Sequence, residues 1–456
     1  MSNKVPSDSL KRVFLLSFLI VCTCGLAIYL LPTVMLGITV EFTGPRHDGY
    51  LELATMLASG EGFRFEPGGD PVMHRPPLYP ILLIPATFLP VGWQEMAVIS
   101  LNSVLAGISC MMLMLLSIRL FGSHRVGYTA VALYLVSPWL YRLVSLPHTA
   151  LLQSTLYLAS AVLLLSMVFG DRHGQPLKSV RFRRAALAYG AVGGLLTLTH
   201  GVGFLVFGVT WFALTVYVTL IAPRSARSGR ASAMLASVCL AGVIAAPWVI
   251  RNAMVLPVTV PVTTGASFNY FMGNVYWNLG GHDNDLERSL QDNALRAGGV
   301  DKAASEAMRF WGVMDPNDES ALATSMREHM LANPMTVLEK SLWSLADNFV
   351  PLTHLVYCQF REAASCAGSN VASRLHQFGL SLYYLALIAL ATVAVVRGRQ
   401  RGPALVMFGL GGLHIGPYLP LGQWAPHGIY GLSAVLLLIV FSAASLLQVP
   451  PRSGGH

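Results

Sequence analysis

The chain has 456 residues, of which 54% are hydrophobic and 11% are charged, and its formal net charge is +8. A soluble domain carries about 25% charged residues, so this composition excludes an ordinary soluble enzyme and predicts a polytopic membrane protein. No basic stretch is interleaved with aromatic residues, which argues against a nucleic-acid partner.

Apolar segments of membrane length recur along the chain. A helix needs roughly 20 apolar residues to cross a bilayer, and only helices or closed barrels satisfy their backbone there. We therefore expect an all-α fold with about ten (roughly 10 to 13) transmembrane helices, interfacial helices in the first outer loop and a small, mostly helical outer region. The predicted spans are 13–36, 95–118, 125–144, 148–170, 185–200, 202–222, 231–250, 375–396, 403–420 and 428–448.

Three of these spans have unusual features. The apolar run at 13–36 is too long for a cleavable signal peptide and no small-residue processing site follows it, so we expect it to stay in the protein. Spans 185–200 and 202–222 form one apolar run that is interrupted only around 199–201.

Charge predicts the orientation. With a cytoplasmic N-terminus, the cytoplasmic loops hold more than half of the 30 basic residues and only Asp8 and Asp171 of the 22 acids. This distribution satisfies the positive-inside rule. We expect a multi-pass protein of the cytoplasmic (inner) membrane with both termini cytoplasmic and the active site on the outer face.

Three parts follow along the chain. Residues 1–250 hold the first spans and the large first outer loop, 37–94, which carries the catalytic site; 251–373 form an outer-face region; 374–456 hold the last spans. Cysteines 22, 24, 110 and 239 lie within spans and are interpreted as small apolar residues. Cys358 and Cys366 are expected on the outer side of the membrane. They could form a disulfide or be two unpaired thiols, because the sequence does not fix the distance between their Cα atoms.

Short helices are expected in the first outer loop. Residues 49–59 are amphipathic, with Asp48 where an N-cap would lie and Gly60 as the C-terminal stop. Residues 77–90 are apolar but too short to span and contain several prolines, so we expect an interfacial or re-entrant segment.

The outer region has two further helix signals. Asn317 and Asp318 can cap a helix that runs through Met330. Asn333-Pro334 is typical of an N-cap followed by proline at the first helical position, and the following amphipathic helix through 347 is expected on the membrane surface.

The first outer loop is the richest in ionisable residues, from Arg46 to Pro80. Such residues beside a membrane are costly unless they have a function. This loop is therefore the predicted site of chemistry. It contains Arg46, His47, Asp48, Arg64, His74 and Arg75.

Several motifs occur in a fixed order. The chain reads Asp-x-Tyr-x-x-x-Ala-x-x-x-Ala-x-Gly-x-Gly-Phe from Asp48 to Phe63. Further motifs are Arg-Pro-Pro-Leu-Tyr-Pro at 75–80, Ser-Pro-Trp at 137–139, Leu-Thr-Leu-Thr-His-Gly at 196–201, Pro-Trp-Val-Ile-Arg-Asn at 247–252 and Phe-Asn-Tyr-Phe-Met-Gly-Asn at 268–274. Together they resemble the GT-C superfamily of membrane glycosyltransferases, in the branch of the protein O-mannosyltransferases and lipid A aminoarabinose transferases, over about residues 10–350.

The resemblance implies an inverting transfer from a polyprenyl-phosphate sugar to a hydroxyl acceptor, with an acid of the first outer loop as base. Asp48 matches that acid. The chemistry is sensible, because the attacking hydroxyl must lose a proton and a phosphate leaving group needs no general acid. Arginine suits phosphate oxygens. The residues expected to bind the phosphate of the lipid donor are Arg75, Arg251, Arg46 and His74.

Each assignment has a structural alternative. Asp48 could only cap a helix, in which case Glu41 is the fallback base. Arg75 and Arg251 could be interfacial anchors whose charged ends reach toward water.

The resemblance also marks a cavity. His74 stands where the aminoarabinose transferases have a metal-binding glutamate, His148 where relatives have an acid, and His200 where they have a lysine. Imidazole can bind zinc, but no second ligand is evident, so we expect no obligatory cofactor and keep a divalent metal at His74 as the alternative. The residues expected to line the substrate cavity are His47, Tyr50, His148, His200, Asn252, Asn269 and Asn274.

Other functions compete with transfer. A transporter or flippase for a lipid-linked sugar should show inverted repeats and intramembrane charges, but the sequence has no repeat and no acidic residue well inside a span. An O-antigen polymerase or ligase should carry its large arginine-bearing loop late in the chain, and a scaffold needs no cavity. The expected partners are the polyprenyl-phosphate donor, the bilayer and a lipid, glycan or protein acceptor. Sugar, carrier length and oligomeric state are not specified.

Overall fold

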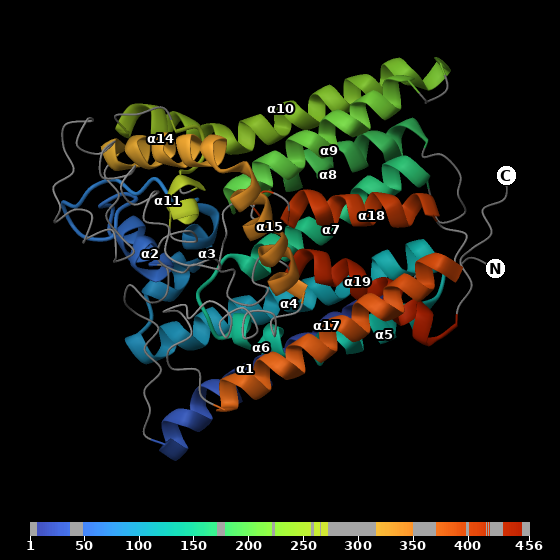
Figure 1. Cartoon of the computed structure of the whole chain (residues 1–456), viewed down its shortest axis with the longest axis horizontal. Helices are drawn as coiled ribbons and strands as arrows, with labels where there is room; N and C mark the ends of the chain where they lie inside the picture. Colours follow the sequence, from blue (N-terminus) through green and yellow to red (C-terminus); the bar gives the residue numbers. More distant parts are fainter. Residues whose placement is uncertain are drawn as a thin grey trace.

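The structure is a computed structural model of the chain (Figure 1). The residues that it describes are 7–36, 49–170, 178–220, 224–256, 260–264, 266–271, 316–349, 371–397, 401–415, 417, 419 and 432–448.

The described residues are built from α-helices, and no strand occurs among them, which confirms the all-α prediction. The helices are α1 (Ser7–Leu36), α2 (Tyr50–Ala58), α3 (Leu78–Thr87), α4 (Val91–Phe121), α5 (His124–Leu135), α6 (Pro138–Val144), α7 (Ala150–Phe169), α8 (Ser179–Thr197), α9 (Gly201–Leu220), α10 (Arg224–Val255), α11 (Ala266–Phe271), α14 (Pro316–Ala332), α15 (Pro334–Phe349), α17 (Val371–Arg397), α18 (Arg401–Ile415) and α19 (Leu432–Leu446).

Six helices in the described ranges are long and apolar enough to cross a membrane, and they lie in α1, α4, α7, α9, α10 and α17. The apolar parts of α18 and α19 are shorter. The chain is therefore a multi-pass membrane protein, while the count of about ten spans stays a prediction. The predicted break around 199–201 is confirmed, because α8 ends at Thr197 and α9 begins at Gly201.

The predicted single span 125–144 is wrong. Its residues form two helices, α5 and α6, that are separated at Val136 and Ser137. Pro138 lacks a backbone N–H, disfavours helical geometry for the residue before it and suits the first position of a new helix. The hydropathy of the segment hid this break, because prolines and serines hardly lower a mean over 20 residues.

The long helices lie side by side in a bundle, and α2, α3, α11 and α14 gather at one end of it (left in Figure 1). α8 and α10 approach most closely: a Cβ added at Gly190 would overlap the backbone of Ser237. Small residues allow such close packing of helices in a membrane. α15 lies across the bundle between α14 and α17 (Figure 1).

The short helices at this end begin and end largely as predicted. α2 ends in a Schellman motif, in which Glu61 N–H donates to Met56 O at 3.0 Å and Gly60 N–H to Leu57 O at 3.2 Å. Gly60 has φ +82, which confirms it as the stop. The N-cap position predicted for Asp48 is occupied by Gly49.

The two outer-region helices are confirmed with small shifts. α14 begins at Pro316, so Asn317 and Asp318 lie in its first turn instead of before it. α15 begins at Pro334 as predicted, and Asn333 O accepts the N–H of Val337 at 3.1 Å.

Candidate active site

Tyr50, the first residue of α2, is the centre of the site. Its ring is buried and meets three other groups. The guanidinium of Arg75 lies 5.3 Å from the ring centroid, within the range of a cation–π contact. The rings of Tyr79 and His148 meet it edge-on at 5.4 and 6.3 Å. Two predicted cavity residues and one predicted phosphate ligand are thus brought together from three separate segments.

A chain of buried hydrogen bonds holds Tyr79, the neighbour of Tyr50, in place. Tyr79 on α3 donates its hydroxyl to Asn102 Oδ1 on α4 at 3.0 Å. The Asn102 amide donates in turn to the carbonyls of Leu143, Val144 and Leu146 at 3.3, 3.1 and 2.8 Å. Burial raises the pKa of Tyr79 above its ordinary value, so the hydroxyl remains a donor at any physiological pH.

Asn102 therefore fixes the end of α6 relative to α3. We expect Asn102→Leu to lower the free energy of unfolding by about 1–3 kcal/mol, because it removes the acceptor of the buried Tyr79 hydroxyl and the side-chain donor to three carbonyls. A lower midpoint of thermal unfolding in detergent would show this loss. Ser100→Ala on the same helix is the matched control, since that hydroxyl bonds only to Met96 O of its own helix. Equal unfolding midpoints for the two variants would contradict the role of Asn102 in fixing α6 relative to α3.

His148 caps the next helix. Its Nδ1 accepts the backbone N–H of Ala150 at 3.0 Å at the start of α7. A neutral His148 therefore carries its proton on Nε2. This hydrogen bond holds the imidazole ring in one orientation beside Tyr50. His148 therefore contributes a polar side chain to the site.

Arg251, near the end of α10, holds the loop that precedes the site. Its Nη1 donates to Val72 O and Asn252 Oδ1 at 3.3 and 2.9 Å, and its Nη2 donates to Phe63 O at 3.2 Å. The guanidinium also lies 4.8 Å from the ring centroid of Trp248. This geometry gives Arg251 a structural role as a tether, and its predicted phosphate contact stays a prediction.

Asn252 and Trp248 extend the tether to a second loop. Asn252 Nδ2 donates to Val260 O and Val262 O at 3.0 and 3.3 Å, and Trp248 Nε1 donates to Val262 O at 2.6 Å. Asn252 is fully buried. It is predicted as a cavity residue; its amide nitrogen binds the backbone of 260–264 and its amide oxygen accepts from Arg251.

The tether can be tested with a charge-conserving change. We expect Arg251→Lys to lower the free energy of unfolding by about 1–3 kcal/mol, because one ammonium cannot reach all three acceptors as the guanidinium does. Thermal unfolding in detergent measures this. Arg230→Lys on the same helix is the control, since its described contact is a 5.2 Å approach to the ring of Phe182. An unchanged midpoint for Arg251→Lys would refute the tether.

His74 lies beside the start of α2. Its ring is 5.8 Å from that of Phe65, and Phe65 lies so close to Gly49 that a Cβ there would overlap the ring. Gly49 has φ +68, a conformation that favours glycine. His74 and Gly49 therefore border the same aromatic ring. The residue before His74 is also held in place, because Met73 O accepts the N–H of Thr264 at 3.1 Å.

A backbone hydrogen bond connects the turn before His200 to the end of the loop that contains His74. Leu78 N–H donates to Leu198 O at 3.0 Å, which joins the start of α3 to the turn that precedes His200. The His200 Nδ1 is 3.4 Å from the N–H of Val202, as a cap of α9. The described ranges contain no group of three or more His, Cys, Asp or Glu side chains that could hold a metal.

Several predicted residues lie outside the described ranges: Glu41, Arg46, His47, Asp48, Asn274, Cys358 and Cys366. Asn269 lies in α11, but its side chain is not among those described. The described cysteines, which are 22, 24, 110 and 239, are free thiols.

Three neighbours of the site were not predicted. Tyr79 and Asn102 carry no sequence signal beyond a polar side chain in an apolar helix. Arg64 had a signal, its place in the charged loop, but no role was assigned to it. Its Nε is buried and has no hydrogen-bond partner among the described residues, and its neighbour Phe63 is tied to Arg251. Arg64 is therefore a further cation beside the site.

No protein-family model and no curated protein matches the sequence. Two solved structures are similar to the chain in fold. One is ArnT from Cupriavidus metallidurans bound to undecaprenyl phosphate, with 15% identity, a TM-score of 0.42 and coverage of 97% of this chain and 78% of that chain. The other is the same protein in the apo state, with 17% identity, a TM-score of 0.38 and coverage of 93% and 76%. Likeness at this level describes a general arrangement of helices.

Proposed function

We propose that the protein is an inverting glycosyltransferase that moves a sugar from a polyprenyl-phosphate donor to a hydroxyl acceptor at the outer face of the cytoplasmic membrane. The observation that carries the proposal is the placement of the Arg75 guanidinium over the ring of Tyr50, 5.3 Å from its centroid. Tyr50 follows Asp48 by two residues. Because consecutive Cα atoms are about 3.8 Å apart, the Asp48 Cα lies within about 7.6 Å of the Tyr50 Cα. The predicted base is therefore two residues away in the sequence from the ring that Arg75 contacts.

The reaction balances with these groups. The acceptor oxygen attacks the anomeric carbon and its proton passes to the Asp48 carboxylate. The bond between the anomeric carbon and the phosphate oxygen breaks, and polyprenyl phosphate leaves with the bonding electrons. Arg75, with Arg64 and His74 nearby, would stabilise the charge on the departing phosphate. One displacement gives inversion of configuration.

The charge at the opposite end of the bundle supports the proposed orientation. α8 and α10 begin at the end away from α2 and α3 (Figure 1). The basic residues near these starts are Arg181, Arg183, Arg184, Arg227 and Arg230. By the positive-inside rule, that end faces the cytoplasm and the site faces the outside.

One assay separates transfer from transport. The purified protein in liposomes is given a pool of polyprenyl-phosphate sugars labelled in the sugar, together with lipid, glycan and peptide acceptors. A transferase releases free polyprenyl phosphate and labels one acceptor class. A flippase moves the intact donor between leaflets without cleaving it, and that outcome would replace our proposal. A polymerase or ligase would require a glycan carried on a lipid diphosphate.

A further inference from the structure

On α15, apolar side chains are exposed and two polar side chains are buried. Its exposed face is mainly apolar, with the exposed Glu339 at its edge: Met335 is 73% exposed, Leu338 50%, Leu342 58% and Leu345 37%. The spacing of three, four and three residues places these side chains on one side of the helix. The opposite face buries a charged and a polar residue, since Lys340 is only 5% exposed and Ser344 1%. A helix on a water-facing surface would show the opposite arrangement.

The helix that carries this face contacts a membrane-crossing helix. α15 contacts α17, whose window 378–396 is apolar enough to span. α17 exposes Phe378, Leu382 and Leu385 at 48%, 53% and 47%. A spanning helix exposes such residues to acyl chains. Because α15 contacts α17, one occupant can cover the exposed apolar side chains of both helices, and the occupant that fits a spanning helix is lipid.

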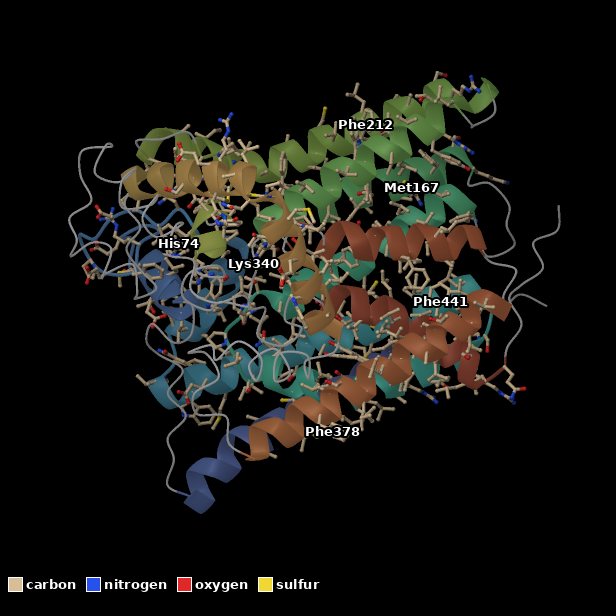
Figure 2. All side chains as sticks on the ribbon, in the orientation of Figure 1. His74, Met167, Phe212, Lys340, Phe378 and Phe441 are labelled. Atoms are coloured by element: carbon tan, nitrogen blue, oxygen red, sulfur yellow. The ribbon has the colours of Figure 1, made fainter. Side chains whose placement is uncertain are left out.

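Lys340 lies toward the end of the molecule that holds the candidate site. Along the long direction of the molecule, Lys340 is in the same half as His74, while Met167, Phe212 and Phe441 lie toward the other end (Figure 2). An ammonium at the membrane boundary is close to the level of lipid phosphates. It presents three N–H donors, which can serve a phosphate together with a protein acceptor.

We infer that α15 lies in the plane of the membrane with its apolar face against acyl chains, and that Lys340 on its inward face binds the phosphate of a polyprenyl-phosphate carrier that enters from the bilayer. The inference rests on the proposed function for the identity of the carrier. It adds a lateral phosphate site, on an element 265 positions after Arg75, to the groups of the first outer loop.

The lipid contact is tested without any activity. A spin label is placed on Leu342→Cys in a cysteine-free protein in liposomes. We expect collisions with dissolved oxygen to exceed collisions with a water-soluble nickel complex, as for Leu382→Cys on α17. Glu61→Cys, in an exposed turn, is the aqueous control. A label on Leu342→Cys that behaves like the Glu61→Cys label would overturn the membrane placement.

The phosphate contact is tested by binding. Native mass spectrometry counts polyprenyl phosphate bound to the full-length protein, with polyprenol as the probe that lacks phosphate and phosphatidylglycerol as the competing anionic lipid. We expect Lys340→Met to weaken polyprenyl phosphate about tenfold or more and polyprenol not at all, because an ionic hydrogen bond is lost. Lys340→Arg should retain binding. Lys178→Met, exposed at the other end of the bundle, is the control.

The outcomes separate this inference from the proposed function. Unchanged binding in Lys340→Met, or selective loss of phosphatidylglycerol, overturns the Lys340 site. Binding of polyprenyl phosphate that depends on Lys340 upholds the site even if no sugar is transferred, in which case the proposed function fails alone. Loss of binding in both Lys340→Met and Lys340→Arg would assign the residue a structural role and contradict the site.

Discussion

Asp48→Asn is expected to reduce the turnover of sugar transfer by about 10²- to 10⁴-fold, the range that a general base contributes. The amide has nearly the same shape as the carboxylate but cannot accept the hydroxyl proton. Since Gly49 is the N-cap of α2, the substitution should leave the helix and the midpoint of thermal unfolding unchanged. Initial rates of polyprenyl phosphate release at saturating donor measure the effect.

Two controls sharpen this result. Asp70→Asn removes an exposed carboxylate from the same loop and should retain full activity. Glu41→Gln tests the fallback base. Full activity in Asp48→Asn would eliminate Asp48 as the base, and loss of activity in Glu41→Gln alone would transfer that role to Glu41.

Arg75→Gln is expected to raise the KM for the donor about 10- to 100-fold, because hydrogen bonds to a charged group contribute about 1.5–3 kcal/mol and each 1.4 kcal/mol is tenfold. A fall in turnover should accompany it, since charge on the phosphate grows as the sugar leaves. Steady-state kinetics with a polyprenyl-phosphate sugar separate the two effects.

The structural alternative for Arg75 is its contact with Tyr50. Arg75→Lys keeps the charge but loses the planar face and the bidentate geometry, so it should recover part of the lost affinity. Arg181→Gln, exposed at the other end of the bundle, is the matched control. A variant Arg75→Gln that unfolds at a lower temperature but keeps its KM would show that the residue only supports the ring.

Local signals predicted the positions of many elements. The proline at 334 and the glycine at 60 mark the ends of α15 and α2 because their restricted or permissive backbones act within one turn. Long apolar runs predicted most of the membrane helices, since the bilayer selects for hydrophobic length alone. The same measure failed at Ser137-Pro138, where a mean over the window conceals a local break.

Residue type and loop position also predicted which side chains lie near one another, but not which contacts each of them makes. Tyr50, Arg75 and His148 were predicted for the site and do meet, while Asn102 was missed, because its partners are carbonyls about 40 positions away along the chain. For Arg251 the sequence predicts a phosphate contact, which stays a prediction, and it gave no sign of the hydrogen bonds to the carbonyls of Phe63 and Val72.

The amino-acid sequence by itself determined that this is a helical membrane protein with a charged loop between apolar segments, because composition and hydropathy are properties of single residues and short windows. Only the tertiary structure decided that Tyr50 joins Arg75 to His148, that Arg251 binds carbonyls of a distant loop and that α15 turns Lys340 inward. These are relations between segments far apart in the chain, and they depend on how the helices pack.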